Sequence, residues 1–242
     1  MTPKEKRFWT GAALVSAELL GTMAAFTGAL ALLVFAVRPW MRKHKKLDLQ
    51  VFDELKPHIN KLNDRLMLDV TFLGKHQFLI PANLLLIFYF LFVHKRTWFS
   101  IRVASVALSS LILMFTLKRI FHRKRPLVPL LEPAKGLSFP SGHAMMSVTF
   151  YGLLIYIISH TVKNQPLKRT LIFTLIALIA AIGFSRIYLR VHYASDVMAG
   201  YIIGLLWLLV ALDVLYRLEE YNKRKMLNAQ SLTRLQWFSI LR

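Results

Sequence analysis

The chain contains no cysteine and few acidic residues: 12 Asp and Glu stand against 32 Lys and Arg among 242 residues. The missing thiols exclude disulfide bonds, thiolate chemistry and cysteine-ligated zinc. The charge imbalance gives a formal net charge of +20. A nucleic-acid-binding protein concentrates such charge on a soluble face. Here the basic residues stand between apolar runs, which favours contact with anionic lipid headgroups or with an anionic substrate.

Hydrophobic residues, by contrast, make up 56% of the chain, and the mean hydropathy is +0.47. A helix needs ~20 largely apolar residues to cross a bilayer, and it must make its backbone hydrogen bonds internally. We therefore predict an all-α fold, a polytopic helical bundle forming one integral membrane domain over residues 1–242, with no nucleic-acid partner. Six apolar runs predict six transmembrane helices, at residues 11–37, 78–93, 101–117, 144–159, 171–184 and 197–216.

The longest polar segment lies between the first two predicted spans. Five apolar residues in it recur at steps of three and four: Phe52, Leu55, Ile59, Leu62 and Leu66. This spacing is typical of an amphipathic helix. We expect that helix, over residues 47–70, to lie on the membrane surface or against the bundle near the substrate entrance. A plain surface linker helix is the alternative interpretation.

Six spans would place both termini on one side of the membrane and the polar connections 118–143 and 186–192 on the other. Lys and Arg are divided almost evenly between the two sides, so the raw count gives no orientation. On the side of the polar connections, several Lys and Arg residues belong to the motifs described below and would bind substrate. The charge of others is partly neutralised by Asp and Glu in the same segment. Discounting these, we expect cytoplasmic termini, a cytoplasmic tail over 217–242 and a site at the outer face of the cell (inner) membrane.

Three polar motifs lie in these connections: KRIFHRKRP from Lys118, PSGH from Pro140 and SRIYLRVHYASD from Ser185. Each alone has a simple structural interpretation. The first could anchor a helix to lipid headgroups, the second could be a turn into a span, and the third could be a charged helix end. Together they fix eleven positions in order on one side of the membrane, which coincidence does not explain.

The third motif suggests a nucleophile. His192 and Asp196 are four residues apart, so on a helix they would lie on one face. The carboxylate could then accept a hydrogen bond from one imidazole nitrogen and leave the other as a lone-pair nucleophile. Arg186 offers a planar fork of donors for a phosphate.

The first two motifs suggest a phosphate site. Lys118 and Arg125, held near Arg186, would form a cationic cradle for phosphoryl oxygens. Ser141 and nearby backbone N–H groups, at the start of a helix, can donate hydrogen bonds to a phosphate. Gly142 would let the backbone approach the ligand closely.

With these residues the chain resembles the type 2 phosphatidic acid phosphatase (PAP2) superfamily, whose motifs are KxxxxxxRP, PSGH and SRxxxxxHxxxD. All eleven fixed residues are present, and the resemblance covers the chain from about residue 50 to residue 216. It implies that His192 attacks phosphorus to form a phosphohistidine, and that Asp196 holds its tautomer. His143 would protonate the leaving oxygen and later activate water. It further implies that no metal or other cofactor is needed, and that the phosphate is bound by Lys118, Arg125, Ser141, Gly142 and Arg186.

The resemblance implies a membrane enzyme that hydrolyses a phosphomonoester or diphosphate of a phospholipid or polyprenyl lipid. Undecaprenyl diphosphate, or a lipid of the phosphatidate or phosphatidylglycerol phosphate type, is the favoured substrate. A lipid A phosphatase or a lipid-to-lipid phosphotransferase would use the same residues. A non-enzymatic lipid transporter or scaffold is a further alternative, in which His192 would be dispensable. Arg190 adds a cation that would contact either a second phosphate of a diphosphate or the lipid headgroups.

Overall fold

The computed structural model describes residues 45–126, 129–130 and 136–240 together with eight isolated positions between residues 20 and 39, and for residues 225–240 it describes the backbone only. All regular structure in these residues is helical, which confirms the predicted all-α fold for this part of the chain. The first predicted span, residues 11–37, lies outside the continuously described residues and stays a prediction.

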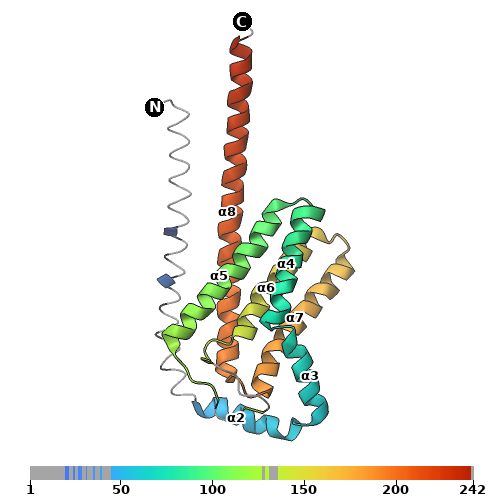
Figure 1. Ribbon diagram of the computed structural model, residues 1–242, viewed down its shortest axis with the longest axis vertical. Helices are drawn as coiled ribbons and strands as arrows, with labels where there is room; N and C mark the ends of the chain where they lie inside the picture. Colours follow the sequence, from blue (N-terminus) through green and yellow to red (C-terminus); the bar gives the residue numbers. More distant parts are fainter. Residues whose placement is uncertain are drawn as a thin grey trace. The chain divides into compact units, whose positions relative to one another are not determined.

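Figure 1 shows the helices in chain order: α2 (Lys45–Leu55), α3 (Lys61–Phe72), α4 (His76–Phe88), α5 (Thr97–Phe121), α6 (Gly142–Thr161), α7 (Gln165–Tyr188) and α8 (Ala194–Ile240). A 3-10 turn, Lys56–His58, follows α2, and a π-helical stretch, Tyr89–Val93, extends α4. Among the described residues, five segments are long and apolar enough to cross a membrane: Lys61–Val93, Thr97–Phe121, Gly142–Thr161, Gln165–Tyr188 and Ala194–Arg224. Each contains one of the last five predicted spans, so these predictions are confirmed in length and composition.

The chain divides into two compact units, one of residues 33–209 and one of residues 1–32 with 210–242. The larger unit contains all three motifs. In the smaller unit, the described part of α8 carries ion pairs one helical turn apart, such as Arg217 with Asp213 at 2.8 Å. The tail beyond residue 217 is thus helical as far as Ile240, while its cytoplasmic location stays a prediction. The prediction of a single domain is not tested by this division.

Helix α6 is the centre of the larger unit, where it packs against α5 and α7. The first turns of α8 also contact α6, through two glycines. A Cβ at Gly200 would lie 2.9 Å from the carbonyl oxygen of Ser141, and a Cβ at Gly204 would lie 2.9 Å from that of Met145. Both distances are too short for a side chain, so α8 approaches the α6 backbone closely only because these positions are glycine.

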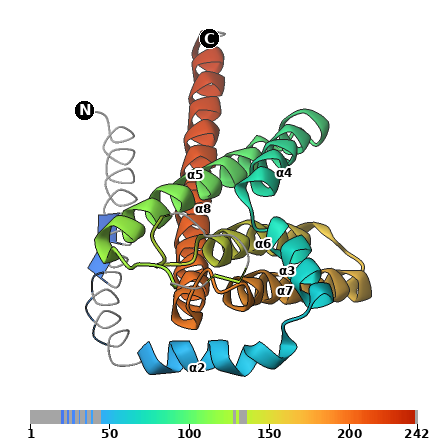
Figure 2. The same ribbon diagram turned by 60° about the horizontal axis from the view of Figure 1, so that its bottom comes forward.

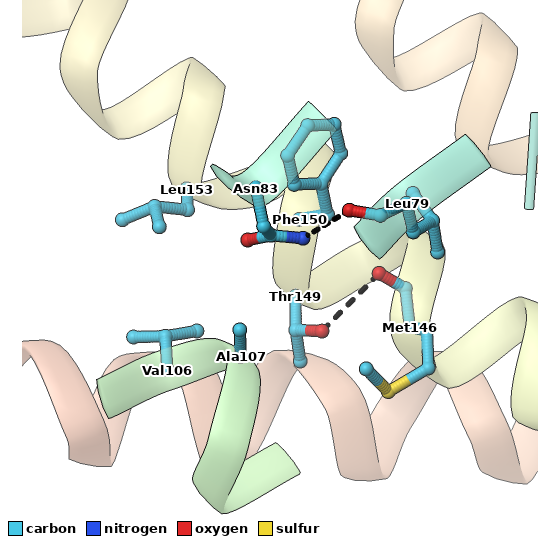
Figure 3. Close-up of a pocket in the computed structure, with 8 residues that line it drawn as sticks. All are labelled: Leu79, Asn83, Val106, Ala107, Met146, Thr149, Phe150 and Leu153. Carbon is cyan, nitrogen blue, oxygen red and sulfur yellow. Dashed lines mark hydrogen bonds between the residues drawn. The ribbon is translucent and has the colours of Figure 1, made fainter. Parts of the chain in front are cut away.

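The apolar core of this unit joins α4, α6 and α7 through the buried side chains of Leu79, Phe150, Tyr151 and Ile182. Beside it is a small cavity between α4, α5 and α6 (Figure 3). Its polar side chains form hydrogen bonds within their own helices. Asn83 donates to the carbonyl of Leu79 at 2.7 Å, and Thr149 donates to that of Met146 at 3.2 Å. No motif residue lines this cavity, so it belongs to the packing of the bundle and not to the phosphate site.

The predicted amphipathic segment is two helices and not one. Pro57 lies in the 3-10 turn between α2 and α3, where it removes a backbone donor, and Asn60 caps α3 by accepting from the N–H of Asn63 at 2.9 Å. Of the predicted apolar stripe, Phe52 is buried, whereas Leu62 is 68% exposed. The first part of the stripe therefore packs on the protein, and the proposed location on the membrane surface stays a prediction.

Candidate active site

The three motifs meet where four helices begin or end. Lys118 lies in the last turn of α5, His143 in the first turn of α6, and Arg186 in the last turn of α7. Asp196 lies in the first turn of α8, and His192 in the connection that precedes it. Figure 1 shows these helix ends toward the lower end of the larger unit. The following contacts bring the side chains together.

His192 is buried, with 1% of its surface exposed, and both of its imidazole nitrogens have neighbours. Nε2 lies 3.1 Å from Nη1 of Arg125. Because an arginine can only donate, Nε2 must accept and therefore carries a lone pair. The proton of the neutral ring is then on Nδ1, which lies 3.3 Å from Oγ of Ser138. The imidazole thus presents an unprotonated nitrogen to the guanidinium of Arg125.

Asp196 lies close to His192, as predicted, but a serine joins the two. The distance from Oδ2 of Asp196 to Nδ1 of His192 is 3.7 Å, which is longer than an ordinary hydrogen bond. Ser138 donates to the same Oδ2 at 2.5 Å, so its oxygen can accept from the imidazole N–H. The expectation that His192 and Asp196 share a helix is wrong, because α8 begins at Ala194.

Lys118 and Arg125 hold the connection between α5 and α6 in place. Nζ of Lys118 donates to the carbonyl oxygens of Leu137 and Pro140, at 2.8 and 3.0 Å. Nη1 of Arg125 donates to the carbonyl of Val191 at 2.8 Å. A lysine has three donors and an arginine has five, so each has further N–H groups that can bind an anion.

Two buried nitrogens of the site have no hydrogen-bond partner among the described residues: Nε of Arg186 and Nε2 of His143. Thr71 of α3 accepts a hydrogen bond from Nη1 of Arg186 at 2.7 Å and so fixes the guanidinium. Leaving a buried polar group unpaired costs about 1–3 kcal/mol, and more for a charged group. Unpaired nitrogens on two different helices are therefore typical of a site built for an anion.

Ser141 and Gly142 are placed by the start of α6. Ser141 caps the helix, with its Oγ 3.5 Å from the N–H of Ala144, and its own N–H donates to the carbonyl of Asp196 at 3.0 Å. A Cβ at Gly142 would lie 2.8 Å from Sδ of Met114 on α5. This neighbour is a flexible side chain of an adjacent helix, and the predicted approach of the Gly142 backbone to a ligand stays a prediction.

The surroundings of His192 keep its imidazole neutral. Burial is the main cause and lowers the pKa of His192 to about 4; Arg125 and Arg186 act in the same direction, and Asp196 opposes them. At neutral pH the ring is therefore uncharged, as a nitrogen nucleophile must be. Within the described ranges, no three His, Asp or Glu side chains are grouped so that they could hold a metal ion.

The model of the PAP2 superfamily matches residues 99–220 of this chain. The chain belongs to the PAP2 superfamily. Phosphatidylglycerophosphatase B of Bacillus subtilis (strain 168) is 31% identical over 155 residues, which are 62% of this chain and 72% of that protein. As a membrane member of the superfamily, the chain is a lipid phosphatase.

Two solved structures have similar folds. A transmembrane PAP2 type phosphatidylglycerolphosphate phosphatase from Bacillus subtilis aligns with a TM-score of 0.67 and 22% identity, over 76% of this chain and 93% of that one. LpxE of Aquifex aeolicus aligns with a TM-score of 0.56 and 28% identity, over 69% of this chain and 95% of that one. The first likeness extends the fold assignment beyond the residues matched by the PAP2 model.

The candidate site includes residues that the sequence did not predict. Ser138 lies two residues before PSGH, and Thr71 lies in α3, far from any motif. Arg123 stands at an unfixed position of the first motif and donates to Asp196 at 2.6 Å. Asp48 of α2 pairs with Arg123 at 2.8 Å. Of these residues, only Asp48 could have been identified from the sequence. It lies one helical turn before Phe52, so it is an acidic residue on the apolar face of the predicted amphipathic helix.

Proposed function

We propose that this PAP2 enzyme hydrolyses the phosphomonoester of phosphatidylglycerol phosphate through a phosphohistidine intermediate. The observation that carries the proposal is the lone pair on Nε2 of His192, held 3.1 Å from Arg125. Around it stand the unpaired nitrogens of Arg186 and His143. A nucleophile, an anion cradle and a second imidazole are the groups that phosphoryl transfer requires.

In the first step, Lys118, Arg125 and Arg186 bind the phosphoryl oxygens, assisted by Ser141 and the Gly142 backbone. Nε2 of His192 attacks phosphorus as the bond to the lipid oxygen breaks. His143 donates a proton to that leaving oxygen, which departs as the lipid alcohol. The imidazole becomes cationic, and its Nδ1–H faces Ser138 and, beyond it, the carboxylate of Asp196.

In the second step, water attacks the phosphorus of the phosphohistidine. His143, now neutral, takes a proton from this water. The phosphorus–nitrogen bond breaks, its electron pair returns to Nε2 of His192, and inorganic phosphate leaves. The three cations balance the charge on the transferring group, so the mechanism uses no metal ion.

Two observations favour a phosphomonoester lipid. The first is the similarity to phosphatidylglycerophosphatase B of Bacillus subtilis, at 31% identity. The second concerns Arg190, the residue that would have bound a second phosphate. Its Nη2 donates to the carbonyl of Phe52 at 3.3 Å, and its guanidinium lies 6.0 Å from the Phe52 ring centroid. These contacts favour a structural role for Arg190 against α2 over binding of the second phosphate of a diphosphate such as undecaprenyl diphosphate.

We further propose that the site lies at the outer face of the cell membrane, with cytoplasmic termini. The proposal rests on the distribution of basic residues among the connections. Labelling of single cysteines, introduced at His122 beside the site and at Lys163 between α6 and α7, tests it. The chain contains no native cysteine to interfere. An impermeant reagent should label position 122, not 163, in intact cells, and the reverse pattern would overturn the orientation.

The activity is tested by phosphate release in a chelating buffer. The lipids are phosphatidylglycerol phosphate, phosphatidic acid, undecaprenyl diphosphate and lipid A. His192→Ala should be inactive, whereas His160→Ala, at the other end of α6, should keep wild-type activity. Fastest release from phosphatidylglycerol phosphate supports the proposal, and preference for another lipid would overturn the substrate. No phosphate release, together with transfer of the phosphoryl group to an added acceptor lipid, would show a phosphotransferase instead.

A further inference from the structure

We propose that Asp48 and Arg123 are positioning residues of the active site, which makes α2 part of the machinery that holds Asp196 against His192. The proposal rests on the assignment of His192 as nucleophile. Asp48 lies outside residues 99–220, the part matched by the superfamily model, so the family assignment says nothing of it. Figure 2 shows α2 lying across the end of the larger unit at which α7 ends and α8 begins.

Asp48 is a buried carboxylate, 5% exposed, on an otherwise largely exposed helix. Its Oδ1 accepts from the backbone N–H of Ser195 at 3.0 Å. Its Oδ2 accepts from the hydroxyl of Ser195 at 2.7 Å and from Nη2 of Arg123 at 2.8 Å. Ser195 immediately precedes Asp196, so Asp48 fixes the first turn of α8 at the residue next to the catalytic carboxylate.

Arg123 joins the two carboxylates. Its Nη1 donates to Oδ1 of Asp196 at 2.6 Å, while its Nη2 donates to Asp48. The guanidinium lies 4.2 Å from the ring centroid of Tyr193, and the Phe52 ring stacks on Tyr193 with the two centroids 5.9 Å apart. Planar stacking and fork-shaped hydrogen bonding fit arginine better than lysine.

The charges of this cluster suit a cationic intermediate. Asp48, Arg123 and Asp196 together carry one net negative charge beside the neutral His192. If Arg123 were paired with Asp196 alone, the two would cancel. Because Asp48 shares the guanidinium, a negative charge remains to stabilise the imidazolium that forms when Nε2 bonds phosphorus. The other charged or titratable groups acting on His192 come from other elements: Arg125 from the α5–α6 connection, His143 from α6 and Arg186 from α7.

The test compares Asp48→Asn with Asp53→Asn in the full-length protein in lipid nanodiscs. Asp53 lies on the same helix and is exposed, and its one ion pair among the described residues is with Lys56, at 2.7 Å. Asp48→Asn should lower kcat about tenfold to a hundredfold, as outer partners of catalytic groups do. KM should change little, because Asp48 does not touch the phosphate site. Asp48→Glu should recover part of the loss, and Asp53→Asn should match the wild type.

A second readout does not depend on turnover. The titration of His192, followed by NMR of protein labelled with ¹³C-histidine, should move to lower pH in Asp48→Asn, because a nearby negative charge is lost. It should move to higher pH in Arg123→Gln, which leaves two carboxylates unneutralised. Equal midpoints in all variants, or a kcat of Asp48→Asn equal to that of Asp53→Asn, would overturn the positioning role. Wild-type inactivity, or an active His192→Ala variant, would instead overturn the proposed function.

Discussion

Ser138 places its hydroxyl oxygen 3.3 Å from Nδ1 of His192. The same hydroxyl donates to Asp196, so it links the proposed nucleophile to its carboxylate. Ser138→Ala should lower kcat about tenfold with little change in KM, because the imidazole keeps its cationic neighbours and loses its orienting contact. The control is Ser147→Ala, since Ser147 is also buried but, within the part of the chain that the structure describes, bonds only to the carbonyl of Ala144 in its own helix. Equal rates in the two variants would show that Asp196 acts on His192 without Ser138.

Arg186 and Arg125 should matter most for transition-state binding. Removing one preorganised donor to a developing charge typically costs about 10²–10³ in kcat. We therefore expect Arg186→Ala and Arg125→Ala each to lose that much in steady-state phosphate release. Arg119→Ala is the control, because Arg119 is exposed and lies at an unfixed position of the same motif. A loss of only a few-fold in both variants would mean that the cradle is formed by other residues.

Thr71 offers a milder test of the same cradle. Thr71→Val keeps the side-chain shape but removes the oxygen that accepts from Arg186 at 2.7 Å. The loss of one hydrogen bond to a charged group, about 1.5–3 kcal/mol, should lower kcat/KM by roughly tenfold to a hundredfold. Thr149→Val, another buried threonine that bonds to its own helix, should leave kcat/KM within a factor of about two. If Thr71→Val behaved like Thr149→Val, α3 would have no part in the site.

The burial of His192 predicts how activity and stability depend on pH. Its pKa is lowered to about 4, so the nucleophile stays neutral at mildly acidic pH and its protonation should reduce kcat/KM only toward pH 4. An unfolded histidine has a pKa of about 6.5, so between these values the unfolded chain binds the extra proton. His192 therefore does not reduce the free energy of unfolding above about pH 6.5. As pH falls from about 6.5 toward 4, protonation of the unfolded chain lowers that free energy.

The stability part of this prediction can be measured by thermal unfolding of the wild type and His192→Ala in the same detergent at pH 7 and pH 5. The melting temperature of the wild type should fall more steeply with acidification than that of the variant. Parallel curves would show that the imidazole is protonated in the folded protein. The midpoint of the acid limb in kcat/KM should agree with the NMR titration of His192.

The sequence was sufficient to predict the last five membrane-spanning helices in length and composition, while the roles of the motif residues stay predictions. Apolar runs long enough to cross a bilayer are a local property, and all five later spans lie within helices of the structure. The sequence predicted one amphipathic helix over residues 47–70, because the apolar spacing continues through Pro57 from Phe52 to Leu62. Only tertiary packing distinguishes the buried first part of this segment from the exposed second part.

The partners of the motif residues could not be predicted, because they come from distant parts of the chain. Thr71 and Arg186 are 115 positions apart, and nothing local to either indicates the pairing. The four-residue spacing of His192 and Asp196 indicates a shared helix. It also fits the observed arrangement, in which His192 precedes α8 and Asp196 lies in the first turn of that helix. The hydroxyl of Ser138 contacts both side chains and links them.

The contact at Gly200 has a consequence for the distance between two proposed catalytic groups. A Cβ at this position would lie 2.9 Å from the carbonyl oxygen of Ser141 and 3.0 Å from the Cβ of Ala144, so the start of α6, with His143, and the start of α8, with Asp196, lie close together. A larger side chain at position 200 would push the two helix starts apart. It would thereby separate His143 from Asp196 without changing any residue of the phosphate site.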